Sequence, residues 1–398
     1  MSATDAFGRM RVSQPETLFD SKQIHDNQPL FWDDQEVSGA GTGSTHSVDA
    51  ARTRMDVTAA TAGVRTRQTF MSFNYQPGKS QLILMTGVIG VGETGITQTM
   101  GLMNDDNGIF LEIADGKPGL VIRSNVTGTP VNTRVEQREW TGDKMDGTGD
   151  STVNLDFDKT QIFFIDIEWL GVGSVRCGFV VNGELIQAHK FNHANDKDTV
   201  YMSTPNLPLR YSLENDGNGG AYTMDHICSS VMSEGGSDDL GFVRSTSTSG
   251  TAVTCTSENV VYALIGIKLK ATYLGAVVKL LAAALQIQTA SETGEWRLIL
   301  NPTVAGTFTY ANETNSAVMT AKGATANTVT NGTVLASGFD NSAGNSGGAA
   351  SSLDTALRTS RYLGSDIAGV VDEIVLCWMP NGGTAAHEVE ATLTWREL

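Results

Sequence analysis

The sequence predicts an all-β chain: two antiparallel, jelly-roll-like β-sandwiches preceded by an extended N-terminal leader. Apolar and β-branched residues come in short runs separated by Gly, Asn and Asp, which is the pattern of strands and tight turns. No long stretch repeats its apolar residues at helical spacing. The chain has 398 residues, which exceeds the usual size of one core and favours two domains.

Residues 1–35 are predicted to form the leader, because they are polar and carry apolar residues only at intervals. Within it, Arg9 and Arg11 alternate with apolar neighbours, the pattern of a short strand with a basic face. Aromatic residues of the leader, Phe19 among them, can pack onto the chain's own domain or onto a neighbouring subunit.

Residues 36–235 are predicted to form the first jelly-roll-like sandwich, from strands joined by short turns. The firmest element is a hairpin whose turn is Asn182-Gly183, because a type I′ turn needs positive φ at both central positions. Other predicted strands are 81–89, 108–113, 119–123, 162–169, 175–181, 200–202 and 207–211.

A polar stretch at 236–258 is predicted to be a linker, and residues 259–398 a second β-sandwich. Residues 277–285 are rich in Ala and Leu, so a helical turn and a strand both remain open there. Residues 336–352 are predicted to form a loop of Gly, Ser and Asn.

The charge of the chain limits its partners. There are 44 acidic and 27 basic residues, a formal net charge of −17, and an acidic chain repels phosphate. Nucleic acid is therefore not an expected partner. The start of the sequence lacks the charged and apolar stretches of a signal peptide, and its longest apolar run is too short to span a bilayer. We therefore expect synthesis in the cytoplasm and no membrane contact.

Asp166 and Glu168 are the best enzymatic lead, because alternation in a strand places residues 164, 166 and 168 on one face. This strand resembles the catalytic strand of the laminarinase-like glycosidases, which are jelly-roll sandwiches with the pattern Glu-x-Asp-x-Glu. The resemblance implies that the outer two acids act as nucleophile and acid/base. Position 164 is Phe, so the nucleophile position has no oxygen, and we predict no enzymatic activity.

Other chemistry finds little support. None of the six histidines belongs to an HExxH motif, and they are predicted to lie at the surface. The four scattered cysteines are predicted to be buried free thiols, and most tryptophans to be core residues rather than a sugar-stacking platform. Turns at 104–108 and 215–219 have oxygen ligands suited to Ca²⁺, yet Asn, Asp and Gly are equally typical of tight turns. We predict no cofactor and no metal.

The leader carries a second resemblance. Residues 5–13 read Asp-Ala-Phe-Gly-Arg-Met-Arg-Val-Ser, and residues 17–20 read Thr-Leu-Phe-Asp. This opening resembles that of uncharacterised virion structural proteins of tailed bacteriophages and large viruses. The resemblance implies a component of a virus particle.

Together these features predict a non-enzymatic virion structural protein of a tailed bacteriophage. Its partners would be copies of itself and neighbouring virion proteins, with a tail, baseplate or fibre position favoured over capsid decoration. The candidate assembly interface is Phe7, Arg9, Arg11 and Phe19, through which the leader adds a strand to a neighbouring subunit. The alternative is a lectin-like module in which the first sandwich binds glycans of the host surface.

Overall fold

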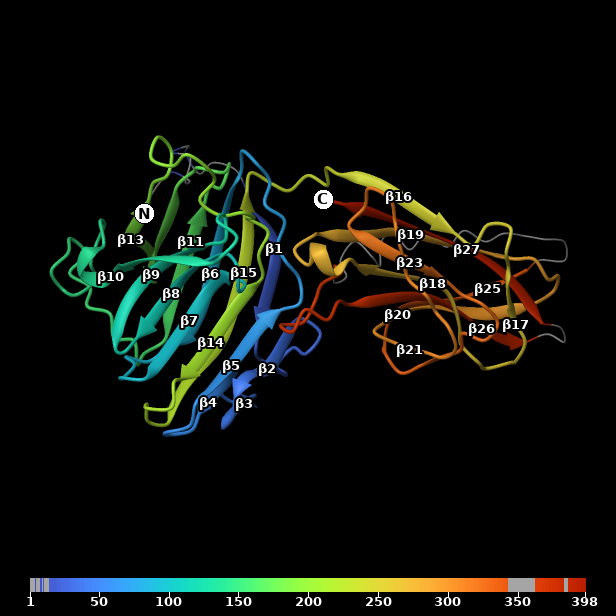
Figure 1. The fold of residues 1–398 in the computed structure, drawn as a ribbon, viewed down its shortest axis with the longest axis horizontal. Coiled ribbons are helices and arrows are strands. Elements are labelled where there is room, and N and C mark those ends of the chain that lie inside the picture. The colour runs from blue at the N-terminus through green and yellow to red at the C-terminus, as the bar shows by residue number, and fades with distance from the viewer. Residues whose placement is uncertain (1–3, 5–7, 9, 11–13, 343–361, 383–385) are drawn as a thin grey trace. The chain divides into compact units, whose positions relative to one another are not determined.

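Alternation of apolar and polar residues gives strands throughout the chain, and every strand pair is antiparallel in the part of the chain that the structure describes. The computed structural model describes residues 4, 8, 10, 14–342, 362–382 and 386–398. They form two units, Met1–Asp238 and Asp239–Leu398 (Figure 1). Helix is limited to the 3₁₀ turns η1 (Gln137–Glu139) and η2 (Ala271–Tyr273) among the described residues. The predicted all-β fold class is confirmed.

The first unit contains two antiparallel sheets. The eight-stranded sheet has the order β13 (Glu184–Phe191), β12 (Val175–Val181), β11 (Gln161–Ile167), β6 (Ser80–Val88), β15 (Tyr222–Glu234), β4 (Arg52–Val57) and β3 (Thr42–Ser47), with β1 (Glu16–Lys22) also on β15. The seven-stranded sheet has the order β10 (Val131–Glu136), β9 (Lys117–Ser124), β8 (Gly108–Ala114), β7 (Ile96–Met103), β14 (Leu209–Asn215), β5 (Gly63–Thr69) and β2 (Trp32–Gly39).

The core of the first unit lies between these sheets. Ile83 and Met85 of β6 and Leu213 of β14 are fully buried, as period-two alternation requires of inward positions. Tyr211 of β14 reaches across, and its hydroxyl contacts the main-chain carbonyl of Cys228 at 3.2 Å and the Ser229 Oγ at 3.0 Å in the other sheet. The two sheets therefore face each other as a sandwich.

The predicted hairpins form. Asn182 and Gly183 join β12 to β13 with φ of 54° and 81°, the two positive values that a type I′ turn requires. Asp115 and Gly116 do the same between β8 and β9, with φ of 51° and 73°. The strand predicted at 200–202 is wrong, because those residues form bends.

The leader differs from the extended segment predicted over 1–35. Residues Glu16–Lys22 form β1, which pairs with β15 inside the eight-stranded sheet. Phe19 and Ser21 point inward and are buried, whereas Asp20 and Lys22 are exposed. The second part of the predicted leader therefore belongs to the first sandwich.

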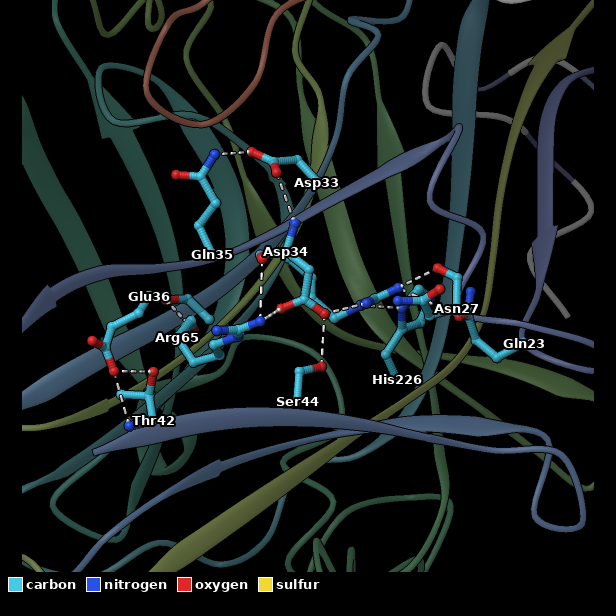
Figure 2. A network of polar contacts seen from close by, with 12 residues as sticks. Gln23, Asn27, Asp33, Asp34, Gln35, Glu36, Thr42, Ser44, Arg65 and His226 are labelled. Carbon is cyan, nitrogen blue, oxygen red and sulfur yellow. Dashed lines mark hydrogen bonds and ion pairs between the residues drawn. The ribbon is translucent and has the colours of Figure 1, made fainter. Parts of the chain in front are cut away.

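A buried polar network fixes the segment between β1 and β2 (Figure 2). The Arg67 guanidinium is completely buried and contacts the Asp34 carboxylate, and it donates to the main-chain carbonyl of Asn27 at 2.8 Å. Arg65 donates to the same carboxylate at 2.6 Å, and the Ser44 hydroxyl does so at 2.6 Å. The Asp34 carboxylate of β2 therefore contacts side chains of β3 and β5. It also supplies the negative charge that the buried Arg67 needs.

His226 lies at the end of this network and makes stability depend on pH. Its ring stacks on Tyr211 at 4.2 Å, and burial, together with the nearby Arg67 charge, lowers the pKa of His226 well below its ordinary value. The unfolded chain then binds more protons than the folded one below about pH 6.5. We expect stability to be complete above that pH and to fall by at most about 1.4 kcal/mol per pH unit for this group below it.

Calorimetry of the unfolding temperature between pH 7.5 and 5.5 measures this effect, with His226→Gln as the comparison. The variant should have a lower unfolding temperature at pH 7.5, and that temperature should fall less between pH 7.5 and 5.5 than it does in the wild type. Equal losses in both proteins would contradict the assignment to His226.

The second unit is a smaller set of antiparallel sheets. A four-stranded sheet has the order β16 (Phe242–Ser247), β27 (His387–Glu397) and β17 (Val253–Cys255), with β19 (Val278–Ile287) also on β27. A six-stranded sheet has the order β22 (Ala311–Asn312), β23 (Val318–Lys322), β18 (Tyr262–Leu269), β26 (Glu373–Gly382), β20 (Thr293–Leu300) and β25 (Thr333–Asn341), and β21 (Thr303–Val304) pairs with β24 (Val329–Thr330). Trp378 and Trp395 are fully buried in its core.

Two segments of this unit differ from those predicted, and one open alternative is decided. The stretch 236–258 contains β16 and β17, both paired with β27, so it is not a plain linker. Residues 278–287 form a strand, which decides between the two alternatives left open at 277–285. Of the loop predicted at 336–352, residues 336–341 belong to β25 and residues 343–352 lie outside the described residues.

Candidate functional site

The candidate assembly residues of the leader fall into two groups. Phe7, Arg9 and Arg11 lie outside the described residues. Phe19 is 5% exposed, and its ring centroid lies 5.1 Å from that of Phe73 and 5.8 Å from that of Phe31. Phe19 is therefore packed into its own unit, the first of the two alternatives that the sequence left open.

Asp166 is held in a buried ion pair. It stands opposite Arg176 in the register of β11 and β12, and their side chains contact each other. The Arg176 guanidinium also donates to the main-chain carbonyl of Thr4 at 3.1 Å, so Thr4 lies against this pair. A carboxylate that neutralises a buried guanidinium is poorly suited to proton transfer, because losing its charge would leave the Arg unpaired.

Position 164, the first position of the Glu-x-Asp-x-Glu pattern, carries no carboxylate in this strand. Phe164 is 4% exposed on the same face of β11 as Asp166, and it supplies no oxygen. Glu168 follows the end of β11 and keeps the strand pairing through its N–H, which donates to the Ser174 carbonyl at 3.0 Å. A retaining mechanism requires two carboxylates on one bond, and this strand offers Glu168 beside an acid that is already paired.

A hollow of about 290 Å³ lies beside Glu168, and it is the candidate site of the first unit. Its lining combines one carboxylate, one ammonium group, one amide and one imidazole: Glu168, Val172, Gly173, Ser174, Lys190, Asn192, His193 and Ala194. These side chains, together with the Ser174 hydroxyl, supply hydrogen-bond donors and acceptors for a polar ligand.

His193 forms a rigid wall of this hollow. Its ring stacks on Tyr201 with centroids 4.0 Å apart, and its Nδ1 donates to the Gly173 carbonyl at 2.7 Å. Burial lowers the pKa of His193, which leaves the imidazole neutral and the other nitrogen an acceptor. Sequence reasoning missed this site, since its residues come from the segment between β11 and β12 and from the end of β13 and the residues after it.

The prediction that the histidines lie at the surface is wrong for four of the six. His189, His193, His226 and His387 are buried, whereas His25 is exposed and His46 half-buried. His387 lies 2.9 Å from the buried Glu292 carboxylate, and its Nε2 is 3.0 Å from the Gly382 carbonyl. Such partners remove the cost of burying an imidazole.

The Asn side chains of the two acidic turns form hydrogen bonds within their own turns. In the turn at 104–108, the Asn104 side chain accepts from the N–H groups of Asp106 and Asn107 at 3.0 and 2.8 Å. In the turn at 215–219, the Asn215 side chain accepts from Gly217 and Gly219 at 2.9 and 3.1 Å. Both are Asx-type turns, which is the second of the two alternatives left open by the sequence. Across the described part of the chain, no three His, Cys, Asp or Glu side chains are placed to hold a metal ion.

Most tryptophans are core residues, as predicted. Trp140, Trp296, Trp378 and Trp395 are buried. Trp169 is half-buried, and its indole N–H donates to the Met202 carbonyl at 3.2 Å. The first unit therefore presents no fully exposed tryptophan in the residues described.

All four cysteines are free. Cys177, Cys255 and Cys377 are buried as predicted, and Cys228 is half-buried. Burial raises the pKa of Cys255 to about 12 and raises those of the other three thiols, which leaves them protonated and unreactive near neutral pH.

An exposed apolar edge in the second unit was missed by sequence reasoning. Leu240, Phe242 and Val243 are 73%, 78% and 54% exposed. β16, which starts at Phe242, pairs with β27 on one side and is the last strand of its sheet among the described residues. Three exposed apolar residues within four positions form an unusual surface for an isolated molecule.

Comparison with known proteins gives no family. No family model matches the chain, and no curated protein matches it. Solved structures with similar backbones include a legume lectin-like domain from Entamoeba histolytica, at 11% identity and a TM-score of 0.34, covering 54% of this chain and 95% of that one. A GH16 protein of the Bacteroides ovatus mixed linkage glucan PUL has 10% identity and a TM-score of 0.37, covering 54% and 99%. The CBM2 module of an evolved Dit from Lactobacillus casei BL23 phage J-1 has 7% identity and a TM-score of 0.36, covering 57% and 99%. All three TM-scores are below 0.5, and all three identities are below 25%.

Within the described residues, no helix combines the length and hydropathy needed to cross a bilayer.

Proposed function

We propose that the chain is a non-enzymatic structural protein of a virus particle, of the tailed bacteriophage type, with a place in the tail, baseplate or fibre. In this role it assembles with copies of itself and with neighbouring virion proteins. The observation that carries the proposal is the exposed apolar edge formed by Phe242 and Val243 at the start of β16 and by Leu240 just before it.

An edge of this kind supports assembly for two physical reasons. The free side of β16 carries main-chain groups that can pair with a strand of another subunit, and the apolar side chains add burial to that pairing. Burying exposed Phe, Leu and Val side chains contributes about 1.5–3 kcal/mol each. The occupant that we propose is a second copy of the chain, because symmetric contacts between identical subunits are the commonest assembly.

The leader supports the same role. Its resemblance to the opening of virion proteins rests on residues 5–13 and 17–20. A carboxylate committed to Arg176 and a Phe at position 164 favour the absence of hydrolytic activity.

We expect Val243→Asp to convert an oligomer of the full-length chain into smaller species, because an aspartate on the edge would oppose pairing in the buried contact. Light scattering during size-exclusion chromatography measures the mass. Val131→Asp is the matched control, because Val131 is also 54% exposed and β10 is also an edge strand. Wild-type protein that is monomeric at high concentration, or equal masses for both variants, would contradict assembly through β16.

A second test addresses the particle. Deletion of residues 2–13 leaves β1 intact, whereas deletion through residue 20 would remove most of β1 and Phe19 from the first unit. The shorter deletion should give a folded protein that is missing from purified particles, as measured by mass spectrometry. Normal incorporation would contradict anchoring through the leader.

A further inference from the structure

A pocket of about 280 Å³ lies at one end of the six-stranded sheet in the second unit. It is lined by residues from the ends of three neighbouring strands, β25, β20 and β26: Thr293, Gly294, Phe339, Asp340, Asn341 and Asn381. Asn341 stands opposite Thr293, and Thr293 stands opposite Gly382, so the strand register itself brings the lining together.

Phe339 gives this pocket an apolar surface. It is 77% exposed on β25, the last strand of its sheet among the described residues. Exposing this much of a Phe ring to water is unfavourable. A ligand with an apolar face that covers the ring would therefore be stabilised by the burial. Glu295 lies opposite Phe339 on β20, and its carboxylate accepts a hydrogen bond from the Arg297 guanidinium at 2.7 Å.

The other lining side chains are short and polar. Asn341 and Asn381 each carry a donor and an acceptor, Thr293 carries a hydroxyl, and the Asp340 carboxylate accepts from the Asn341 N–H at 2.8 Å. A sugar hydroxyl is both donor and acceptor, so paired amide groups match it. The Asp340 carboxylate disfavours an anionic ligand.

A buried cluster holds the pocket in shape. Glu292 precedes Thr293, and its main chain exchanges bonds with Ser342 at 2.8 and 2.9 Å, which ties β20 to β25. His387 contacts both Glu292 and the Gly382 carbonyl, which ties the end of β26 to the same point. At Gly294 a Cβ would lie 2.2 Å from Trp378 Cζ2, so only glycine fits there and the main chain itself forms part of the lining.

We propose that this pocket binds a neutral sugar ring, stacked on Phe339 and hydrogen-bonded by Asn341, Asn381, Thr293 and Asp340. The volume is slightly below the range of about 300–1,000 Å³ for drug-sized ligands and suits one ring of a longer glycan. The site is independent of the assembly role proposed above. It gives the glycan-binding alternative a place in the second unit, rather than in the first sandwich where the sequence placed it.

Ligand-observed NMR on the full-length chain tests this, with glucose, galactose, mannose and N-acetylglucosamine as separate probes. A single ring of this size should bind with a Kd of about 1 mM. We expect saturation transfer to at least one sugar, at least tenfold weaker binding in Phe339→Ala and in Asn381→Ala, and retained binding in Phe339→Tyr.

Val334→Ala is the matched control, because Val334 is another exposed apolar residue of β25, at 49% exposure, and does not line the pocket. It should bind like the wild type. The proposal is overturned if the wild type gives no transfer with any of the four sugars, or if binding persists in Phe339→Ala and Asn381→Ala. Retained binding in Phe339→Tyr would show that an aromatic ring is what the ligand needs at this position, and an unfolding transition of Phe339→Ala equal to that of the wild type would show that this variant is folded.

Discussion

Asp34→Ala is expected to lower the free energy of unfolding of the first unit by about 3–5 kcal/mol, because it leaves the buried Arg67 guanidinium without its carboxylate. Asp34 also accepts hydrogen bonds from Arg65 and Ser44 (Figure 2), so β3 and β5 both lose their shared partner on β2. Burial already lowers the pKa of Arg67, which indicates how strongly the surroundings disfavour its charge. Denaturant unfolding of the full-length chain measures the loss.

The control for this variant is Asp20→Ala. Asp20 pairs with Lys22 at 3.0 Å, but both side chains are 60% exposed, and such a pair contributes about 0–1 kcal/mol. A loss in Asp34→Ala as small as that of Asp20→Ala would show that water solvates Arg67, and that the network does not hold the segment between β1 and β2.

Strands with a buried apolar face were predictable, because the alternation of apolar and polar residues is visible in a short stretch of sequence. β6, β8, β9, β11 and β12 all lie within about two residues of their predicted positions. The Asn-Gly turn was predictable for the same reason, since its backbone requirement is local.

Strands without that alternation were missed. β16 contains Ser245, Thr246 and Ser247, and none of its residues is buried, so its place in the sheet depends on main-chain pairing with β27. β1 was missed because one of its inward residues is polar: the Ser21 hydroxyl accepts from the Trp32 indole at 2.8 Å. The strands that pair with β16 and β1, namely β27 and β15, lie far away in the sequence. Composition alone therefore predicted a linker and a leader for these two segments.

The candidate sites escaped prediction because their residues meet only in the folded chain. The pocket at Phe339 combines positions 293–294, 339–341 and 381. The buried histidines were misassigned for the same reason, as His226 depends on Trp32, 194 positions earlier, at a centroid distance of 4.3 Å. By contrast, the shared face of Phe164 and Asp166 could be predicted, because both residues lie on one strand and alternation is a local property.

Phe19→Ala is expected to lower the free energy of unfolding by about 3–5 kcal/mol. The reason is the cavity left among Phe31, Trp32 and Phe73, whose ring centroids lie 5.8, 6.2 and 5.1 Å from that of Phe19. Denaturant unfolding measures it, with Met10→Ala as the control, because Met10 is 71% exposed and should change stability by no more than about 0.5 kcal/mol.

The same variant separates the two possible roles of the leader. If Phe19 belongs to the core, Phe19→Ala lowers stability, while the folded molecules keep the oligomeric mass of the wild type. If Phe19 belongs to an interface between subunits, the mass falls and the stability of the separated subunit is unchanged. The first outcome would agree with the pairing of β1 with β15 inside the first sandwich. The deletion of residues 2–13 is the sharper test of anchoring, because it leaves β1 in place.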